Sequence, residues 1–385
     1  MSLGFWYWFF TGPGLLLALL SLRGDRKRAR YVARRLAETP QNLPPATVIV
    51  PVKGAEEGLA GNLAALAELD YPDYELLITA RSAADIPAGV LPVRAKVVLA
   101  GGNDPGTSEK IQNLTAAVRA ARKHSSVLVF ADSDGRVTAG WLRALVGPLA
   151  EPGVGAVTGY RWFLPEPPDF WSLLRGVWDA VAYGALGEGN SRFVWGGAMA
   201  ISKELFFEAR IPELWRGELS DDYVVGEAVR AAGLSIAYAP GALTPCLQHT
   251  GGARLLGWIR RQMAITRLYA PRLWWPGLIS HVFYCGGMAA SVVAACRGHR
   301  LAEWALVAQL GPGMLKGLNR ATLAKASLPE YESWFKRHLW VHAIWVPLGT
   351  WLWLFALAGS AFSKHIQWRG YRLELKRPGR YGAGR

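Results

Sequence analysis

Short apolar runs alternate with amphipathic segments between residues 44 and 240, and this alternation predicts a mostly parallel sheet with helices on its faces. The apolar runs end at turn residues and are rich in Val, Ile and Leu, as buried strands of such a sheet are. We expect strands over residues 46–52, 74–79, 96–100, 127–131 and 155–159, and helices over 58–69, 108–124 and 218–233. The predicted fold class of this region is therefore α/β.

Apolar stretches on both sides of this region predict membrane helices. Residues 3–22 contain no charged side chain, over about the length needed to cross a ~30 Å hydrocarbon core. Residues 276–296 and 338–362 are also long enough and free of Asp, Glu, Lys and Arg. The stretch 301–315 is shorter and contains Glu303, so a third span, a re-entrant segment and an interfacial helix remain alternatives. We expect two crossings after the soluble region.

Basic residues next to the apolar stretches indicate their orientation. Residues 23–35 hold seven Arg or Lys and one acid, and the tail from Lys364 onward is also basic. Both flanks are expected to face the cytoplasm, with the amino terminus outside and the first span an uncleaved anchor. The net charge of +14 then reflects topology and anionic headgroups rather than nucleic acid, for which no binding motif is visible.

The chain is thus expected to be a multi-pass integral membrane protein, in a bacterial inner membrane or in the Golgi or endoplasmic reticulum of a eukaryote. We expect a transmembrane anchor (1–23), a basic linker (24–43), a cytoplasmic α/β domain (44–250), an amphipathic interfacial helix (251–274), membrane helices (275–363) and a basic cytoplasmic tail (364–385). The cysteines, at 246, 285 and 296, lack zinc-ligand spacing and are expected to be free thiols.

Two acidic pairs are candidates for chemistry. Asp132 and Asp134 follow the strand at 127–131, at the sheet edge where open α/β sheets bind ligands. Two carboxylates at this spacing suit one Mg²⁺ or Mn²⁺, although a capped turn is the simpler alternative for the residues alone. Asp221 and Asp222 open the helix at 218–233, where they are either functional acids or a cap that complements the helix dipole.

A series of motifs in fixed order makes the pattern more specific. They are "VPVKG" (50–54), "LDYPDYELL" (69–77), "AAD" (83–85) followed by "IPAGV", "EKIQNL" (109–114), "ADSDGRV" (131–137), "LSDDY" (219–223) and "GWIRRQMAITRLY" (257–269). The set resembles the inverting nucleotide-sugar glycosyltransferases of the GT-A fold, most closely the ceramide glucosyltransferase type with its bacterial relatives. The resemblance covers about residues 40–270 and the flanking membrane segments, and it favours the metal-binding alternative for Asp132 and Asp134.

The resemblance implies a role for each candidate residue. It assigns Lys53, Asp85, Lys110, Asp132 and Arg261 to the nucleotide sugar, Asp132 and Asp134 to Mg²⁺ or Mn²⁺, Asp222 to the general base, and Trp195, Gly196 and Asp221 to the acceptor side. A separate base is needed because inversion in one displacement requires the acceptor hydroxyl to lose its proton as it attacks. Without the resemblance, Lys53 and Lys110 would be interpreted as surface lysines.

The last motif departs from the family pattern of Gln or Arg, two residues, then Arg-Trp. Arg261 matches its first position, but Ala264 and Ile265 stand where Arg-Trp is expected. Either Arg267 and Tyr269 supply the cation and the aromatic ring from further along the helix, or this part of the nucleotide site is weakened. Because apolar and basic residues alternate here, the segment is also a candidate for the membrane surface.

The expected activity is transfer of a hexose, glucose from UDP-glucose, with inversion onto a lipid hydroxyl such as that of ceramide. The expected partners are the nucleotide sugar, the lipid acceptor and the membrane, without nucleic acid. Two alternatives remain open: a processive polysaccharide synthase, and a non-catalytic membrane scaffold that keeps the fold.

Overall fold

A seven-stranded sheet and a set of long helices make up the computed structural model, which describes residues 3–102, 104, 106–189, 191–368 and 371–375. The strands are β1 (Ala46–Pro51), β2 (Tyr74–Ala80), β3 (Ala95–Leu99), β4 (Val127–Ala131), β5 (Val154–Phe163), β6 (Ala198–Ser202) and β7 (Ser235–Cys246). The helices of the sheet domain are α3 (Leu59–Ala67), α4 (Glu109–Ala120), α5 (Trp141–Val146), α6 (Phe170–Tyr183), α7 (Lys203–Glu208), α8 (Ile211–Leu214) and α9 (Asp221–Ala231). The remaining helices are α1 (Leu3–Ser21), α2 (Asp25–Ala37), α10 (Gly252–Tyr269), α11 (Pro271–Cys296), α12 (Arg300–Ser327), α13 (Glu332–His338), α14 (Val341–Ile344) and α15 (Val346–Ala361).

The sheet has the strand order β3-β2-β1-β4-β6-β5-β7. Strand β6 is antiparallel to both of its neighbours, and every other adjacent pair is parallel. The carboxyl ends of β1 and β4 therefore lie side by side at one edge of the sheet, which is where ligands bind in open α/β sheets. This arrangement confirms the predicted α/β class with a mostly parallel sheet.

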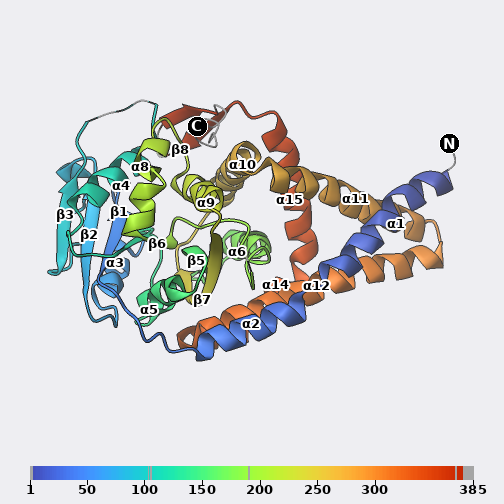
Figure 1. Ribbon diagram of the computed structural model, residues 1–385. Coiled ribbons are helices and arrows are strands. Elements are labelled where there is room, and N and C mark those ends of the chain that lie inside the picture. The colour runs from blue at the N-terminus through green and yellow to red at the C-terminus, as the bar shows by residue number, and fades with distance from the viewer. Residues whose placement is uncertain (1–2, 103, 105, 190, 369–370, 376–385) are drawn as a thin grey trace.

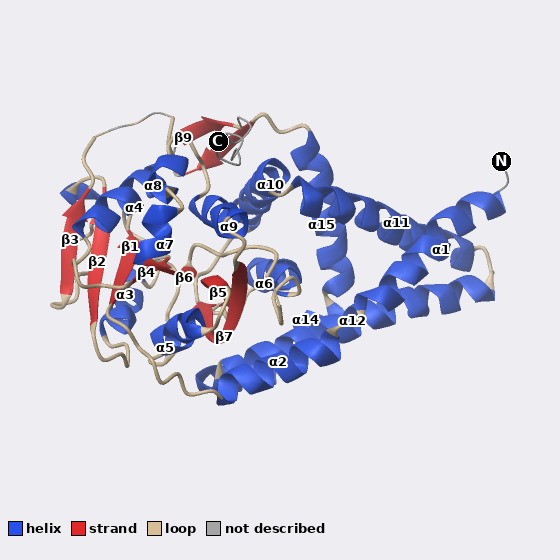
Figure 2. Ribbon diagram, viewed as in Figure 1, coloured by secondary structure: helices blue, strands red, loops and turns tan. Residues whose placement is uncertain are grey.

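Both faces of the sheet are covered, which explains why its central strands read as continuous apolar runs. Successive residues point to opposite faces: Val48 belongs to an apolar cluster with α3 and α5, whereas Ile49 belongs to a cluster with α4 and α9. Tyr31 and Val32 of α2 are buried in the first cluster. Figure 2 shows the strands gathered in one part of the molecule and the long helices extending away from it.

The extension consists of α1, α11 and the first part of α12, which pack side by side away from the sheet, whereas the later part of α12 returns along α2 to β7 (Figure 1). Small residues allow this close approach: a Cβ on Gly286 would lie 2.6 Å from the Phe10 ring, and one on Gly287 would lie 3.1 Å from the Phe10 carbonyl oxygen. In the described residues, two helical segments are long and apolar enough to cross a membrane, Gly4–Ala37 and Pro271–Cys296. By length and composition, then, the part of the chain that the structure describes contains two candidate membrane spans.

Several segments differ from the sequence predictions. The expected basic linker at 24–43 is mostly the helix α2, because Tyr31 and Val32 give it a buried face. The expected helix at 251–274 is divided: α10 ends at Tyr269 and α11 begins at Pro271, where proline is well suited to the first helical turn. The stretch 301–315 lies inside the 28-residue helix α12, which continues through Pro312.

Two further differences concern the carboxyl-terminal region. The expected span at 338–362 is not one helix but is divided at Leu339 and Trp345 between α13, α14 and the 16-residue apolar helix α15. The expected tail contains a two-stranded hairpin, β8 (His365–Trp368) and β9 (Tyr371–Glu374), in which Ile366 is buried against Leu219 and Ala264. The end of the tail, residues 376–385, lies outside the described residues.

Candidate active site

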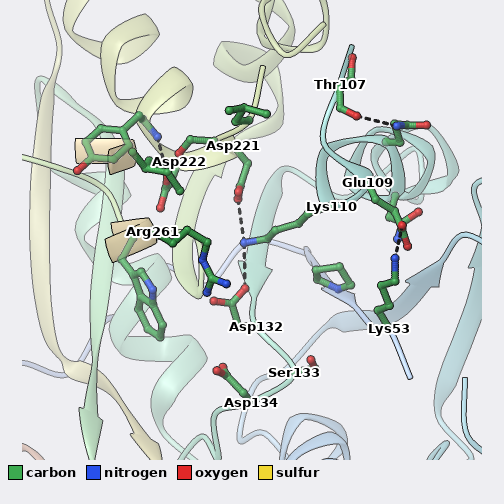
Figure 3. A pocket seen from close by; sticks show the side chains of 18 of the residues that line it. Lys53, Thr107, Glu109, Lys110, Asp132, Ser133, Asp134, Asp221, Asp222 and Arg261 are labelled. Atoms are coloured by element: carbon green, nitrogen blue, oxygen red, sulfur yellow. Dashed lines mark hydrogen bonds and ion pairs between the residues drawn. The ribbon is translucent and has the colours of Figure 1, made fainter. Parts of the chain in front are cut away.

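A cavity of about 470 Å³ opens at the carboxyl ends of β1 and β4 and is closed on the other side by α9 and α10. Figure 3 shows side chains from all four elements turned toward this space. The predicted site residues that line it are Lys53, Lys110, Asp132, Asp134, Trp195, Asp221, Asp222 and Arg261. Residues separated by more than 200 positions in the sequence are thus brought to one cavity.

Lys110 joins the two acidic pairs. Its Nζ lies 2.9 Å from Oδ1 of Asp132 and 3.2 Å from Oδ2 of Asp221 (Figure 3). Burial lowers the pKa of Lys110, but the carboxylates of Asp132, Asp221 and Asp222 outweigh burial and raise it above the usual lysine value. The ammonium group therefore stays charged and holds these acids together. In the other direction, burial raises the pKa of Asp221 to about 6 even though Lys110 lowers it.

Asp134 is the second of the two acids that follow β4, and it is partly buried. Its Oδ1 is buried and accepts no hydrogen bond from the described residues. Burial, followed by the neighbouring carboxylate of Asp132, raises the pKa of Asp134 to about 6, although Arg161 lowers it. A buried carboxylate oxygen without a donor is costly unless a cation or another donor reaches it. The surroundings of Asp134 therefore fit a bound cation.

Asp222 lies at the start of α9 with both oxygens accepting hydrogen bonds. Oδ2 accepts one from the backbone amide of Gly196 at 3.1 Å, and Oδ1 accepts others from its neighbours Ser220 and Tyr223. Asp222 is only partly buried, whereas Asp221 is 5% exposed. The two neighbouring acids thus have different surroundings: Asp221 is ion-paired with Lys110, and Asp222 is held by neutral donors at the cavity wall.

Lys53 lies in the loop after β1, and Asp85 lies in a helical turn after β2. Lys53 lines the cavity and forms an ion pair with Glu109 at the start of α4. Asp85 caps a single helical turn, Ala83–Asp85, by accepting hydrogen bonds from the backbone amide and the hydroxyl of Ser82. Its carbonyl oxygen accepts a hydrogen bond from Gly54, so Asp85 supports the Lys53 loop. The side chain of Asp85 is not among the described residues that line the cavity.

The motif that departs from the family pattern, residues 257–269, lies in α10. Arg261 and Ile265 line the cavity, whereas Arg267 points away and donates hydrogen bonds to the carbonyl oxygens of Ala361 and Ser363 at the end of α15. Tyr269 donates a hydrogen bond to Glu218 and stacks on Tyr223 at 5.7 Å between ring centroids. Arg267 therefore secures α15, and Tyr269 supports the segment that carries the Asp221–Asp222 pair.

Among the cavity residues to which the sequence analysis assigned no role, Arg161 and Trp258 have the clearest contacts. Arg161 lies in β5 and forms an ion pair with the buried Asp179 at 3.2 Å. Its guanidinium is 5.0 Å from the Trp258 ring centroid and 5.5 Å from that of Trp195. A charged residue inside the buried strand "TGYRWF" was the available signal, because buried charges are rare unless they are paired. Trp195 itself is 7% exposed and packs edge-on against Tyr160.

An open α/β sheet binds its ligands at the carboxyl edge, where this chain gathers carboxylates and cations. The model of glycosyl transferase family 21 matches residues 13–381, which is most of the chain, and the chain belongs to this family. The predicted resemblance and the GT-A class of fold are thereby confirmed, and the protein is a nucleotide-sugar glycosyltransferase.

Solved structures with similar folds have low sequence identity to this chain. A mannosyltransferase from Pyrobaculum calidifontis, solved with GDP-Man and Mn²⁺, is 17% identical with a TM-score of 0.45, covering 91% of this chain and 97% of that chain. Glucosyl-3-phosphoglycerate synthase from Mycobacterium tuberculosis, solved with Mn²⁺, UDP and glucosyl-3-phosphoglycerate, is 18% identical with a TM-score of 0.38, covering 62% of this chain and 82% of that chain.

Proposed function

We propose that the protein is a membrane-bound inverting hexosyltransferase that transfers glucose from UDP-glucose to a lipid hydroxyl such as that of ceramide. The observation that carries this proposal is the position of Asp222. Its carboxylate reaches the same cavity as Asp132 and Asp134 but comes from a different element, and it belongs to the wall formed with α10. The cavity thus offers a separate acid for the acceptor, as a single displacement requires.

The donor end of the cavity is defined by its cations. Lys53, Lys110 and Arg261 line it together with Asp132 and Asp134, and the Arg261 side chain points toward the space around Asp132 (Figure 3). Lysine and arginine suit a diphosphate, arginine by paired hydrogen bonds and lysine as a point charge. We therefore assign the nucleoside diphosphate to this end, with Asp85 supporting the loop that carries Lys53.

Asp132 and Asp134 are the residues that would hold Mg²⁺ or Mn²⁺. In the described residues no group of three or more His, Cys, Asp and Glu forms a complete metal site, so further oxygen ligands would have to come from the diphosphate and water. The buried Oδ1 of Asp134, which lacks a donor, fits this arrangement. When bound, the cation neutralises charge that develops on the departing nucleoside diphosphate.

Asp222 is the proposed general base, and Asp221 its positioning residue. Asp221 forms an ion pair with Lys110. Asp222 instead accepts hydrogen bonds from the neutral donors Gly196, Ser220 and Tyr223, and it remains partly exposed to the cavity. These donors orient the carboxylate toward an incoming hydroxyl. Asp222 takes the proton of that hydroxyl as its oxygen attacks the anomeric carbon, and the diphosphate leaves from the opposite face.

The helix α10 links the cavity to the helices expected in the membrane. One face lines the cavity with Trp258, Arg261 and Ile265, while Leu255, Ile259 and Met263 are buried against α15 and α11. A lipid acceptor can then present its hydroxyl at Asp222 without leaving the bilayer, which would cost ~0.8 kcal/mol per exposed methylene. Trp195 and Gly196 lie on this acceptor side.

The same geometry favours a multi-pass arrangement with the sheet domain on the cytoplasmic side. The helices α11 and α12 form an antiparallel pair joined at residues 297–299, and both return to the sheet domain (Figure 1). The basic residues after α1 agree with this orientation. The catalytic domain and the carboxyl-terminal hairpin then face the cytoplasm, whichever cellular membrane holds the protein.

A product assay tests the proposal against its alternatives. The purified full-length protein is incubated with a panel of nucleotide sugars, Mn²⁺ and a total lipid extract, and lipids are searched by mass spectrometry for a hexose increment. The expected result is a glucosylated lipid formed from UDP-glucose and inhibited by chelation of the metal. A soluble polymer would instead identify a processive synthase, and the absence of both transfer and UDP-sugar hydrolysis would identify a non-catalytic scaffold.

A further inference from the structure

A second group of charged side chains lies where α1 ends, on the contact between α2 and α12. Arg28 comes from α2, and Lys316 and Arg320 lie one turn apart on the same side of α12. Asp25 is placed among them by an ion pair with Arg28 at 3.4 Å and a hydrogen bond from Asn319 at 3.1 Å. Because Asn319 of α12 donates to Asp25, and Lys316 and Arg320 flank Asn319 on that helix, the three cations and Asp25 lie at the same contact. We call these four residues the α2–α12 cationic cluster.

Positive charge exceeds negative charge in this cluster. Arg28 uses its guanidinium to donate to the carbonyl oxygens of Gly184 and Leu186, which follow α6. Arg320 is 9% exposed, and its Nε has no hydrogen-bond partner in the described residues. Lys316 also forms no hydrogen bond or ion pair with the described residues. Asp25, the carboxylate at this contact, is already paired with Arg28 and accepts a hydrogen bond from Asn319. A buried cation without a partner is costly, so the cluster is complete only with an added anion.

The position of the cluster selects the kind of anion. The apolar helix α1 ends at Ser21, and Asp25 begins α2 only a few residues later. If α1 crosses the membrane as expected, this turn lies at the level of the lipid headgroups. Basic pockets between helices at this level are suited to anionic headgroups, whose phosphate oxygens accept hydrogen bonds from Lys and Arg.

We propose that the α2–α12 cationic cluster binds the phosphate group of an anionic membrane lipid through Lys316 and Arg320. The lipid joins α12 to the turn between α1 and α2, and thereby fixes the sheet domain against the membrane. This site is separate from the cavity that holds Asp132 and Asp222. It depends on the insertion of α1 in the membrane but not on the identity of the sugar or the acceptor.

Lipid titration of the full-length protein in detergent micelles tests the proposal. Dioleoylphosphatidylglycerol is added against a background of dioleoylphosphatidylcholine, and binding is followed by native mass spectrometry and by the thermal unfolding midpoint. Lys316→Gln is expected to weaken phosphatidylglycerol binding about tenfold, because it removes one charged hydrogen bond to the phosphate. Lys325→Gln is the matched control: Lys325 lies further along α12 and is paired with Glu332 at 3.2 Å, so binding should stay within about twofold of the parent.

Arg320→Met separates lipid binding from a structural role. Without lipid, this variant should unfold no earlier than the parent, because an apolar side chain replaces a buried unpaired charge. The rise in unfolding midpoint caused by phosphatidylglycerol should be lost. Equal lipid binding by the parent and Lys316→Gln would overturn the proposal. Saturation of the cluster by free inorganic phosphate, with no preference for phosphatidylglycerol over phosphatidylcholine, would overturn the assignment to a lipid.

Discussion

The backbone amide of Gly196 donates a hydrogen bond to Oδ2 of Asp222 over 3.1 Å. The same glycine leaves no room for a side chain, since a Cβ would lie 2.5 Å from Oδ2 of Asp221 and 3.2 Å from Nζ of Lys110. The segment that precedes β6 therefore touches both acids of α9 and the lysine that joins them to Asp132. Glycine is required at position 196 because there is no space for a Cβ. The requirement is steric and does not come from the backbone dihedral angles.

Gly196→Ala tests this contact. The added methyl group should displace Asp221 and Lys110 and rotate Asp222 away from its hydrogen bond, which we expect to lower the rate of sugar transfer about 10²-fold, the typical effect of a misplacement of about 1 Å. The measurement is steady-state transfer with UDP-glucose. Gly257→Ala in α10, where a Cβ would meet no atom within 4 Å, is the control and should keep transfer near the parent rate. Equal rates for both variants would show that the Gly196 contact has no catalytic importance.

The two arginines of α10 should have separable effects. Arg261→Gln removes a cation from the cavity wall and is expected to raise the KM for UDP-glucose about tenfold, in line with a lost charged hydrogen bond. Arg267→Gln removes the hydrogen bonds to Ala361 and Ser363, and should lower the thermal unfolding midpoint while leaving that KM unchanged. The opposite result, with Arg267→Gln raising the KM, would mean that Arg267 replaces the missing arginine of the family motif.

The sheet was predictable where its strands are buried on both faces. β1, β2 and β4 are rich in Val, Ile and Leu, and their boundaries agree with the prediction to within one residue. β6 was missed because "AMAIS" is short and contains small residues typical of either state. β7 was missed because Pro240 and Gly241 interrupt its apolar pattern. β6 depends on pairing with β4 and β5, and β7 depends on pairing with β5, which local sequence does not report.

The motifs predicted which residues belong to the site, but they did not predict which of these residues contact one another. Because Asp132 and Asp134 end a strand, their place at the sheet edge followed from the sequence. The bridge by Lys110 between Asp132 and Asp221 did not, since it joins residues 111 positions apart through a tertiary contact. The same holds for Arg161, whose burial depends on Asp179 in α6. Tertiary ion pairs of this kind leave no periodic signal in a sequence.

Asp179→Ala should destabilise the sheet domain more than any exposed ion pair does. Asp179 is 3% exposed and neutralises Arg161, whose side chain is 12% exposed, so its removal leaves a largely enclosed guanidinium unpaired, an effect of ~3–5 kcal/mol. The measurement is the thermal unfolding midpoint in detergent. Asp70→Ala is the control, because the Asp70–Arg143 pair is exposed and such pairs contribute ~0–1 kcal/mol. Similar shifts for the two variants would contradict the importance assigned to the Arg161–Asp179 pair.

The carboxyl terminus should lie on the same side of the membrane as the sheet domain. Ile366 of the terminal hairpin is buried against Ala264 of α10, and the tail is strongly basic. A reporter fused after Arg385 is therefore expected to behave as cytoplasmic. A reporter inserted after Gly298, in the turn between α11 and α12, should report the opposite side. Reporters that report the same side would show that α11 and α12 do not cross as a pair.

The acids of the cavity should lose different functions when each is neutralised. Asp132→Asn removes a charged oxygen ligand, so it should weaken the binding of both Mn²⁺ and UDP. Asp222→Asn should leave that binding unchanged, because the donor end of the cavity is built from other residues, but it should lower transfer by ~10² to 10⁴ through loss of the base. Asparagine is close to aspartate in shape, so both variants are expected to fold.

Calorimetric titration of UDP and Mn²⁺, together with the rate of transfer to lipid, distinguishes the two roles. Asp221→Asn is an informative third variant: it leaves Lys110 with one carboxylate fewer, and should impair donor binding and transfer together because Lys110 also contacts Asp132. Transfer by Asp222→Asn within a few-fold of the parent would exclude Asp222 as the base. If UDP binding by Asp132→Asn kept its full dependence on Mn²⁺, Asp132 would be an ion-pair partner of Lys110 and not a metal ligand. Asp132 and Asp134 would then serve only to cap the turn after β4.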